Sequence, residues 1–344
     1  MKSIKLYFEA AIEQGASDLH LVGDEKPCLR IQGDLQDVEE KVLPPKELET
    51  AVLGLLSAEQ KKKFQEKLEL DFGLDVKGVR FRVNLHRQEG HVGLAARMIP
   101  AEIPSPEELR FEPALNNFTD LLDGLVLVVG PTGHGKSTTL ASMVEEINKK
   151  RKAHIMTIED PIEFLFQDKE SLVEQREIGT DTHSFDEALK HVLRQDPDVI
   201  LVGEMRDPET IATALTAAET GHLVFSTLHT SSAAEAVERI VDVFEGSRQK
   251  QVLIQLGAVL RGIVAQQLMP SVQGSRVVAR EILVNTPAIS NLVKENNIPQ
   301  IYSAIQTGAK EGMVTMDNSV KQLLKDGLID KEMAEKRMGK QRRI

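Results

Sequence analysis

The sequence predicts an α/β protein: a larger part built on a parallel sheet, preceded by a smaller α+β domain. After residue 115, short apolar runs alternate with helical patterns, which is typical of parallel strands buried on both faces. These runs are Leu125–Val129, Ile155–Ile158, Val199–Val202 and Leu223–Phe225. Before residue 100, strand patterns follow one another across short turns. With 344 residues the chain exceeds one ordinary core, so two domains are expected.

The smaller α+β domain is predicted over residues 1–100. Apolar residues at helical spacing indicate a first helix that Gly15 ends, and these residues are Ile4, Phe8, Ala11 and Ile12. Leu53–Leu56 is placed in a second helix, and Ser57 with Gln60 forms a capping box that opens a third. Lys77-Gly78 and Glu89-Gly90 supply turns. The expected strands are Leu19–Val22, Cys28–Ile31, Leu70–Val76, Val79–Arg87 and Gly93–Met98.

Prolines then crowd one stretch and predict an interdomain linker over residues 101–115 that can act as a hinge, since proline disfavours both helix and sheet ladder. They are Pro100, Pro104, Pro106 and Pro113. Residues 116–285 form the expected core of the larger domain, and residues 286–344 form a helical C-terminal region. Capping patterns predict several helix starts. They are Ser184 with Glu187, Asp207 before Pro208, Thr286 before Pro287, and Asp330, while Gly221 ends a helix.

Composition excludes several classes of protein. A net charge of −11, aromatic residues at 4% and the lack of tryptophan argue against a nucleic-acid-binding protein. Cys28 is the single cysteine, so neither an intrachain disulfide nor a cysteine zinc site is expected. No apolar run approaches the length of a membrane span, and the acidic, helical start does not resemble a signal peptide. We therefore expect a cytoplasmic protein with no direct membrane insertion.

A phosphate-binding loop follows the first predicted strand of the larger domain. Its pattern is G-x-x-x-x-G-K-[ST], and it lies between a strand and a helix, the context that separates it from a chance glycine turn. Backbone N–H groups and the helix N-terminus would face phosphate oxygens, Lys136 would add a charge, and Ser137 would ligate Mg²⁺. No Asn-Lys-x-Asp guanine signature is present, so ATP is favoured, although the loop alone fits a kinase as well. The expected loop residues are Gly130, Pro131, Thr132, Gly133, His134, Gly135, Lys136, Ser137 and Thr138.

Glu204 is the candidate for orienting or deprotonating the attacking water. It lies two positions after the end of the strand Val199–Val202, and in an open α/β sheet that end faces the ligand crevice. Gly203 stands where a Walker-B aspartate is usual, so the pattern is a variant. The alternative role, capping the next helix, is already filled by Asp207.

Acids also follow another strand of the same sheet, at Glu159, Asp160 and Glu163. Like charges beside a phosphate site repel one another unless a cation is present. Glu159 and Glu163 are therefore candidates for contacts to the attacking water or to the water around Mg²⁺. The alternative is a solvated acidic turn.

Histidines and arginines complete the candidates. His229 and His222 bracket the strand Leu223–Phe225, and His229 lies at the end where a γ-phosphate sensor would lie, although a lone histidine is as often a packing residue. Arg80 and Arg82 share a strand face, and Arg97 lies on another strand. They could reach a phosphate across a domain or subunit boundary, or simply be solvated.

These segments together resemble the type IV pilus retraction ATPases, the PilT family within the GspE/PilT secretion ATPases. The resemblance covers nearly the whole chain and its motifs are highly specific. The matching segments are Gly15–His20, Gly78–Asn84, Gly130–Thr139, Thr157–Phe164, Gln175–Glu177, Asp181–Phe185, Asp196–Asp207, Thr220–Thr230 and Gln300–Gly308.

The resemblance implies a PAS-like N-terminal domain joined to a RecA-like P-loop ATPase domain. It implies a homohexamer that uses ATP and Mg²⁺ and works at the cytoplasmic base of the pilus machine on an inner-membrane platform protein. Carried over by position, Glu204 matches the Walker-B glutamate, Glu163 the acidic-box glutamate and His229 the histidine-box residue. Arg82 and Arg97 match the arginines that reach ATP at the domain and subunit interface.

Two residues depart from the family pattern. His134 stands where the family usually has serine, and because only its backbone N–H is expected to matter, nucleotide binding should survive. Ser290 replaces the arginine of the Ala-Ile-Arg motif of the retraction subgroup, which bears on coupling and on the direction of work. The alternatives are an assembly or type II secretion ATPase of the same superfamily, and a RecA-like DNA motor. A scaffold that binds ATP without hydrolysing it is a further alternative.

Overall fold

The chain divides into two compact units in the computed structural model, which describes residues 3–31, 33–39, 41–99 and 102–341. The first unit runs to Glu102 and includes Pro161–Leu165, and the second holds the remainder of the chain. Each unit has its own hydrophobic core. Residues 100 and 101, where the expected linker starts, lie outside the described residues.

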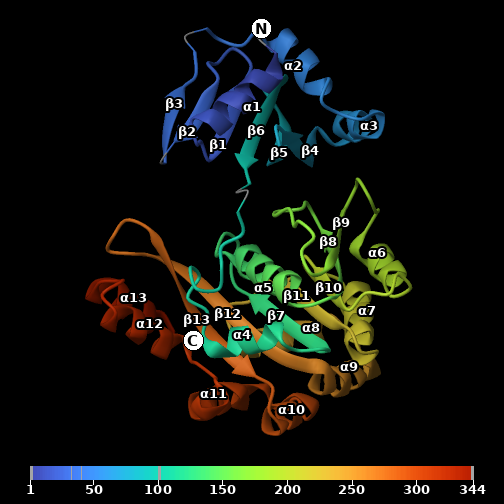
Figure 1. Cartoon of the computed structure of the whole chain (residues 1–344), viewed down its shortest axis with the longest axis vertical. Coiled ribbons are helices and arrows are strands. Elements are labelled where there is room, and N and C mark those ends of the chain that lie inside the picture. The colour runs from blue at the N-terminus through green and yellow to red at the C-terminus, as the bar shows by residue number, and fades with distance from the viewer. Residues whose placement is uncertain (1–2, 32, 40, 100–101, 342–344) are drawn as a thin grey trace. The chain divides into compact units, whose positions relative to one another are not determined.

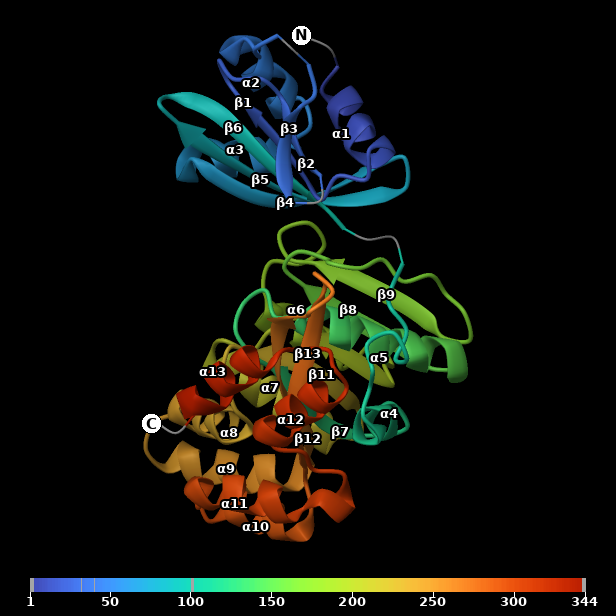
Figure 2. The same cartoon turned by 90° about the vertical axis from the view of Figure 1, so that its left-hand side faces the viewer.

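The first unit contains a six-stranded antiparallel sheet in the order β3-β2-β1-β6-β5-β4. The helices α1 and α2 pack on it (Figure 2). Phe8 of α1 meets Phe81 of β5 edge to face, with ring centroids 5.0 Å apart. The strands are β1 Asp18–Val22, β2 Cys28–Ile31, β3 Asp34–Asp37, β4 Glu69–Val76, β5 Val79–Gln88 and β6 His91–Met98. The helices are α1 Ile4–Glu13, α2 Pro45–Leu53 and α3 Ala58–Lys67.

Local sequence signals account for most of this unit. The capping box at Ser57 is present, and both expected turns have left-handed backbone, as does Gly15 after α1. The placement of Leu53–Leu56 in a helix was wrong beyond Leu53, where α2 ends. Ser57 must be extended to cap α3, so the chain leaves α2 by a turn before it. Strand β3 was not predicted, because all its residues are exposed and show no apolar pattern.

The second unit contains a seven-stranded mixed sheet in the order β13-β12-β7-β11-β10-β8-β9. Its central strands are parallel, as predicted, whereas β13 runs antiparallel to β12. The strands β9, β12 and β13 were not predicted, since polar residues interrupt each of them. The strands are β7 Gly124–Val129, β8 His154–Glu159, β9 Leu172–Glu177, β10 Val199–Val202, β11 Leu223–Leu228, β12 Leu260–Pro270 and β13 Arg276–Val284.

Helices cover both faces of this sheet, as alternation along β7 requires. Val126 and Val128 pack with α4 and α5, while Leu125 and Leu127 face the helices α6 to α9. Figure 1 shows these helices on the two sides of the sheet. These helices are α4 Pro113–Thr119, α5 Lys136–Lys150, α6 Phe185–Val192, α7 Pro208–Glu219, α8 Ala233–Asp242 and α9 Ser247–Val259. The helical C-terminal region follows, with α12 packed on β13 and on α13. It comprises α10 Pro287–Lys294, α11 Ile301–Thr307, α12 Met316–Lys325, α13 Lys331–Gln341, and 3-10 turns at Ile298–Gln300 and Ala309–Glu311.

Arg280 of β13 anchors the segment that leads into α4. Its guanidinium donates to the carbonyls of Leu109 at 2.9 Å and Arg110 at 3.1 Å, pairs with Glu112 at 3.0 Å, and lies over the ring of Phe111. Arg280 is only 1% exposed, so burial lowers its pKa while Glu112 raises it. Residues 109–112 therefore belong firmly to the second unit.

Candidate active site

The segment Gly130–Thr138 joins β7 to α5 and has the backbone of a phosphate-binding loop. Gly130, Gly133 and Gly135 have φ angles of 150°, 77° and 80°, which side-chain-bearing residues rarely adopt. A Cβ atom at Gly130 would also lie 2.4 Å from the carbonyl oxygen of Gln266. Glycine is therefore required at Gly130 by both conformation and space.

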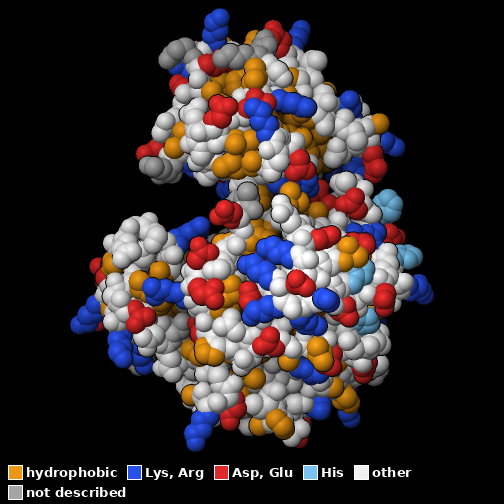
Figure 3. Space-filling view, viewed as in Figure 1, with side chains coloured by type: hydrophobic (Ala, Val, Ile, Leu, Met, Phe, Trp, Pro, Cys, Tyr) orange, Lys and Arg blue, Asp and Glu red, His pale blue; other side chains and the backbone are white. Residues whose placement is uncertain are grey.

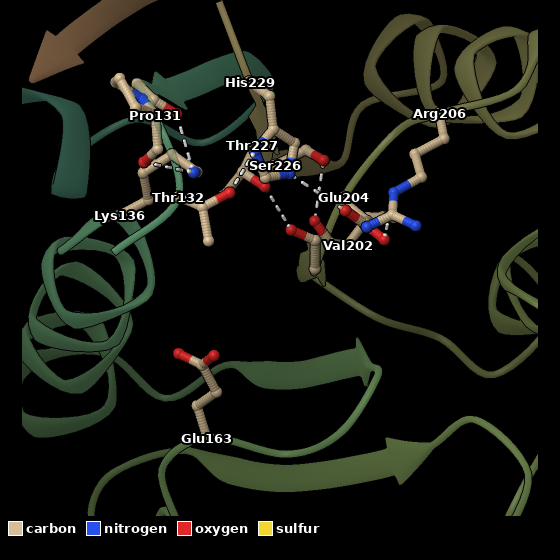
Figure 4. Close-up of polar contacts among 12 residues, drawn as sticks. Pro131, Thr132, Lys136, Glu163, Val202, Glu204, Arg206, Ser226, Thr227 and His229 are labelled. Carbon is tan, nitrogen blue, oxygen red and sulfur yellow. Dashed lines mark hydrogen bonds and ion pairs between the residues drawn. The ribbon is translucent and has the colours of Figure 1, made fainter. Parts of the chain in front are cut away.

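Lys136, the first residue of α5, lies inside the loop. Its side chain is buried, and Nζ donates to the carbonyls of Gly130 at 2.8 Å and Pro131 at 3.2 Å (Figure 4). These contacts hold the ammonium group over the loop. Phosphate oxygens would offer it charge-assisted hydrogen bonds, which are stronger than those to neutral carbonyls.

A row of polar contacts connects this loop to Glu204. Thr132 Oγ1 lies 3.3 Å from His229 Nδ1, and His229 Nε2 lies 3.4 Å from Glu204 Oε2 (Figure 4). The other Glu204 oxygen lies 2.7 Å from Arg206 Nε. Arg206 was not among the predicted site residues, although it stands two positions after Glu204. The structure therefore brings together three sites that the sequence places on separate segments.

The strand order explains this convergence. Strand β11 lies between β7 and β10, so the residues that follow these parallel strands meet at one edge of the sheet. Ser226 Oγ donates to the carbonyl of Val202 at 2.8 Å, and Thr227 Oγ1 donates to that of Gly203 at 2.6 Å. These bonds fix the ends of β10 and β11 side by side. Glu204 and His229 thus extend from a rigid base.

The acidic segment after β8 is split between the two units. Glu159 is only 9% exposed and accepts from Thr157 Oγ1 at 2.7 Å, so the solvated-turn alternative was wrong for this residue. Glu163 falls in the segment grouped with the first unit, where its Oε1 lies 3.5 Å from Arg82 Nη1.

The candidate arginines lie on the sheet of the first unit. Arg82 and Arg97 are direct partners across β5 and β6, with side chains 43% and 70% exposed. Asp18, the partner of Arg97 across β1 and β6, accepts from Arg97 Nε at 2.9 Å. Arg80 instead pairs with Asp75 at 2.7 Å and is 14% exposed. Like charges opposite each other are unfavourable, and here each arginine contacts a carboxylate, Arg82 that of Glu163 and Arg97 that of Asp18.

The histidines His222 and His134 each have a contact within the fold. His222 lies at the amino end of β11, where its Nδ1 contacts the carbonyl of Ala217 at 2.9 Å, so it is a structural residue. The side chain of His134 has a contact of its own, since the N–H of Leu268 donates to His134 Nδ1 at 3.0 Å. That nucleotide binding depends only on the backbone N–H of His134 stays a prediction. Burial lowers the pKa of His134, and the charges of Arg337, Lys136 and Arg276 lower it further.

Known proteins resemble this chain along nearly its whole length. The family model of type II/IV secretion system proteins matches residues 1–332. The chain is 48% identical to the type IV pilus retraction ATPase PilT of Pseudomonas aeruginosa, with 94% of each protein covered. It is 47% identical to a twitching motility protein of Neisseria gonorrhoeae, covering 90% of this chain and 84% of that protein. The crystal structure of the pilus retraction motor PilT with bound ADP superposes with a TM-score of 0.90 at 45% identity, covering 98% of this chain and 97% of the other.

Proposed function

This chain belongs to the type II/IV secretion system protein family and to the pilus retraction ATPases within it, and on that premise we propose that it is the ATP-hydrolysing motor that retracts a type IV pilus and drives twitching motility. The proposal adopts the fold names of that family, a PAS-like first unit and a RecA-like second unit. The observation that carries it is the contact row from Thr132 through His229 to Glu204.

The phosphate loop, Glu204 and His229 each have a role in the proposed reaction. The loop amides and Lys136 bind the β- and γ-phosphates. Glu204 orients and deprotonates the attacking water, because it lies at the loop end of the sheet and contacts His229, which contacts the loop. His229 contacts both the loop and Glu204, so a γ-phosphate bound at the loop can change the position of Glu204 through His229. Hydrolysis therefore needs the two strands β10 and β11 to keep their register.

Magnesium binding is proposed at Ser137, which follows Lys136 in the first turn of α5. Its hydroxyl oxygen is a hard ligand of the kind that Mg²⁺ prefers. The described residues hold no group of three or more His, Cys, Asp or Glu side chains that could bind a metal ion. Glu163 is proposed to contact the water around the ion. When bound, Mg²⁺ neutralises charge on the transferring phosphate.

The proposed motor is a homohexamer in which Arg82 and Arg97 act on ATP held by a neighbouring subunit. Both side chains are substantially exposed on one sheet face, and arginines supplied across an interface accelerate phosphoryl transfer by about 10³–10⁵. In the proposed cycle, binding and release of nucleotide would move the two units with the proline-rich linker, predicted over residues 101–115, as the hinge. Arg280 holds residues 109–112 of that linker to β13. The moving units would act on a platform protein.

The proposed place of work is the cytoplasmic face of the inner membrane, reached through the pilus machine. None of the helices in the described ranges has the length and apolar character needed to span a membrane. On the face shown in Figure 3, Lys and Arg side chains are interspersed with Asp and Glu side chains. That mixed surface, with a net charge of −11, gives no support to the DNA-motor alternative.

The test of the proposed function is ATP hydrolysis by the purified protein with magnesium, compared with two variants. Lys136→Ala should lose ATP binding and turnover together. Glu204→Gln should keep binding but lose turnover by about 10²-fold or more, since general-base catalysis contributes roughly that much. Turnover that is absent in the wild type, or unchanged in Glu204→Gln, would contradict the assignment.

The direction of work is tested by deleting the gene. Loss of a retraction motor leaves excess surface pili and abolishes twitching, whereas loss of an assembly motor leaves cells without pili. This experiment is needed because Ser290 replaces the arginine of the retraction subgroup's motif. Ser290 Oγ donates to the carbonyl of Gly257 at 2.6 Å and thereby joins α10 to α9. An arginine at this position would lack the hydroxyl that makes this bond.

A further inference from the structure

Gln266 lies behind the phosphate loop and belongs to no nucleotide-binding motif. It is part of β12, the strand that pairs in parallel with β7, and its side chain is 1% exposed. Its neighbour Gln267 is 7% exposed and points to the opposite face of the sheet, as strand alternation requires. A fully buried carboxamide is costly unless its oxygen and nitrogen both have partners.

Both ends of the Gln266 carboxamide are bonded to the loop region. The amide nitrogen donates to the carbonyl of His134 at 2.8 Å, inside the loop. The amide oxygen accepts from Thr139 Oγ1 at 2.9 Å, in the first turn of α5. One side chain therefore connects the loop to the helix that follows it.

The backbone around Gln266 adds two further constraints on the loop. Its carbonyl oxygen occupies the space that a Cβ atom at Gly130 would need, at 2.4 Å, so β12 packs closely against the first glycine. Two residues later, the N–H of Leu268 donates to His134 Nδ1 at 3.0 Å. Strand β12 thus packs closely against the start of the loop at Gly130 and is hydrogen-bonded to it near its end at His134.

These contacts affect phosphate binding because the loop binds with its backbone. The amides converge on phosphate oxygens only while the loop keeps its curled conformation, and its glycines make other conformations accessible at little steric cost. Fixing a loop in its binding conformation before the ligand arrives increases affinity by removing the entropic cost of ordering it. Gln266 has the position and the bonds to do this.

We propose that Gln266 is a positioning residue of the nucleotide site: its carboxamide fixes the phosphate loop to α5 and so sets the affinity for nucleotide. The inference rests on the proposed ATPase function. Gln266 reaches the phosphates only through His134 and Thr139. It therefore acts on binding and leaves the water-activating residues Glu204 and His229, on other strands, in place.

The experiment measures the affinity of the purified full-length chain for N-methylanthraniloyl-ATP, and KM and kcat for ATP. Gln266→Leu removes both hydrogen bonds at similar volume, and Thr139→Val removes only the bond to α5. Gln267→Leu is the matched control, with the same substitution on the same strand but the opposite face. Circular dichroism and thermal melting establish that each variant folds.

Gln266→Leu is expected to weaken nucleotide binding and raise KM by about tenfold or more, since two buried hydrogen bonds are lost. Its kcat at saturating ATP should stay within about twofold of wild type, because transition-state contacts are untouched. Thr139→Val should weaken binding less, and combining it with Gln266→Leu should add little, because both remove one shared interaction.

Three results would overturn the inference. Folded Gln266→Leu could bind nucleotide as wild type does, it could lose kcat with KM unchanged, or Gln267→Leu could show an equal loss of affinity. If Gln266→Leu does not fold, Thr139→Val decides, and wild-type affinity in that variant contradicts the inference. A wild-type protein that binds no nucleotide would instead contradict the proposed function, so the two failures are distinguishable.

Discussion

Gln266 of β12 and Arg280 of β13 are direct partners across an antiparallel strand pair, so their side chains leave the same face of the sheet. Gln266 contacts the phosphate loop and α5. Arg280 contacts the carbonyls of Leu109 and Arg110, at the end of the segment that leads from the first unit. One pair of adjacent residues therefore contacts both the nucleotide loop and the segment of residues 109–112 that leads into α4.

Replacing Arg280 should free the segment of residues 109–112 from β13. Arg280→Met removes a buried charge and leaves the carboxylate of Glu112 and two carbonyls without their donor, so we expect a loss of about 3–5 kcal/mol in the free energy of unfolding. Hydrogen exchange at residues 105–112 should accelerate. Arg239→Met, at an exposed position of α8, is the control and should change stability by less than about 0.5 kcal/mol. Unchanged exchange in Arg280→Met would show that the segment is held by other contacts.

The two histidines that flank β11 should separate catalysis from structure. His229→Ala should lower kcat by about 10²-fold with ATP affinity nearly unchanged, because His229 contacts Glu204 and the loop. His222→Ala should keep wild-type kcat, since His222 contacts Ala217 at the other end of the strand. Steady-state hydrolysis and nucleotide binding measure both effects. Equal losses in the two variants would indicate that His229 acts only through folding.

Mixing inactive variants should reveal whether Arg97 acts between subunits. Arg97→Ala and Glu204→Gln are each expected to be inactive. In rings assembled at random from equal amounts of the two variants, about a quarter of the sites combine an intact Glu204 with an intact Arg97 from the neighbouring subunit. If Arg97 acts across the interface, roughly a quarter of the wild-type activity should therefore return. ATP hydrolysis after joint refolding or co-expression measures it. A mixture that stays inactive would place Arg97 in the same subunit as the ATP that it contacts.

His134 should make the stability of the nucleotide-free protein depend on pH. Its Nδ1 accepts from Leu268, and its pKa is lowered from 6.5 by burial, followed by the charges of Arg337, Lys136 and Arg276. Below about pH 6.5 the unfolded chain takes up a proton that the folded chain does not. The contribution of neutral His134 to the free energy of unfolding is therefore present above pH 6.5 and is lost as pH falls.

The matched variant is His134→Ser, the residue usual in the family. At pH 8 it should be less stable than wild type by about 1 kcal/mol, the value of one hydrogen bond, and the difference should shrink toward pH 5.5. Thermal melting of both proteins over this pH range measures the effect. A difference that grows as pH falls would contradict the neutral, accepting state of His134.

Local signals determine much of the structure of the first unit. The capping box at Ser57, the turn at Lys77-Gly78 and the helix end at Gly15 depend on a few neighbouring residues, and each was predicted correctly. Strand β3 and the edge strand β9 were missed for the opposite reason. Their residues are largely polar or exposed, so they are strands because a neighbour offers a hydrogen-bonding edge.

The sequence by itself determined the phosphate loop and the candidates Glu204 and His229. Loop function resides in contiguous residues, whose glycines and lysine set the backbone conformation and charge within one turn, while a residue directly after a buried parallel strand must lie at the ligand edge of the sheet. Only the tertiary structure decided the contact from His229 to Glu204, the Gln266 contacts to the loop and the Arg280 anchor. Gln266 and His134 stand 132 positions apart in the chain. Residues so distant meet only through the order in which strands pair, and that order follows from packing the whole core.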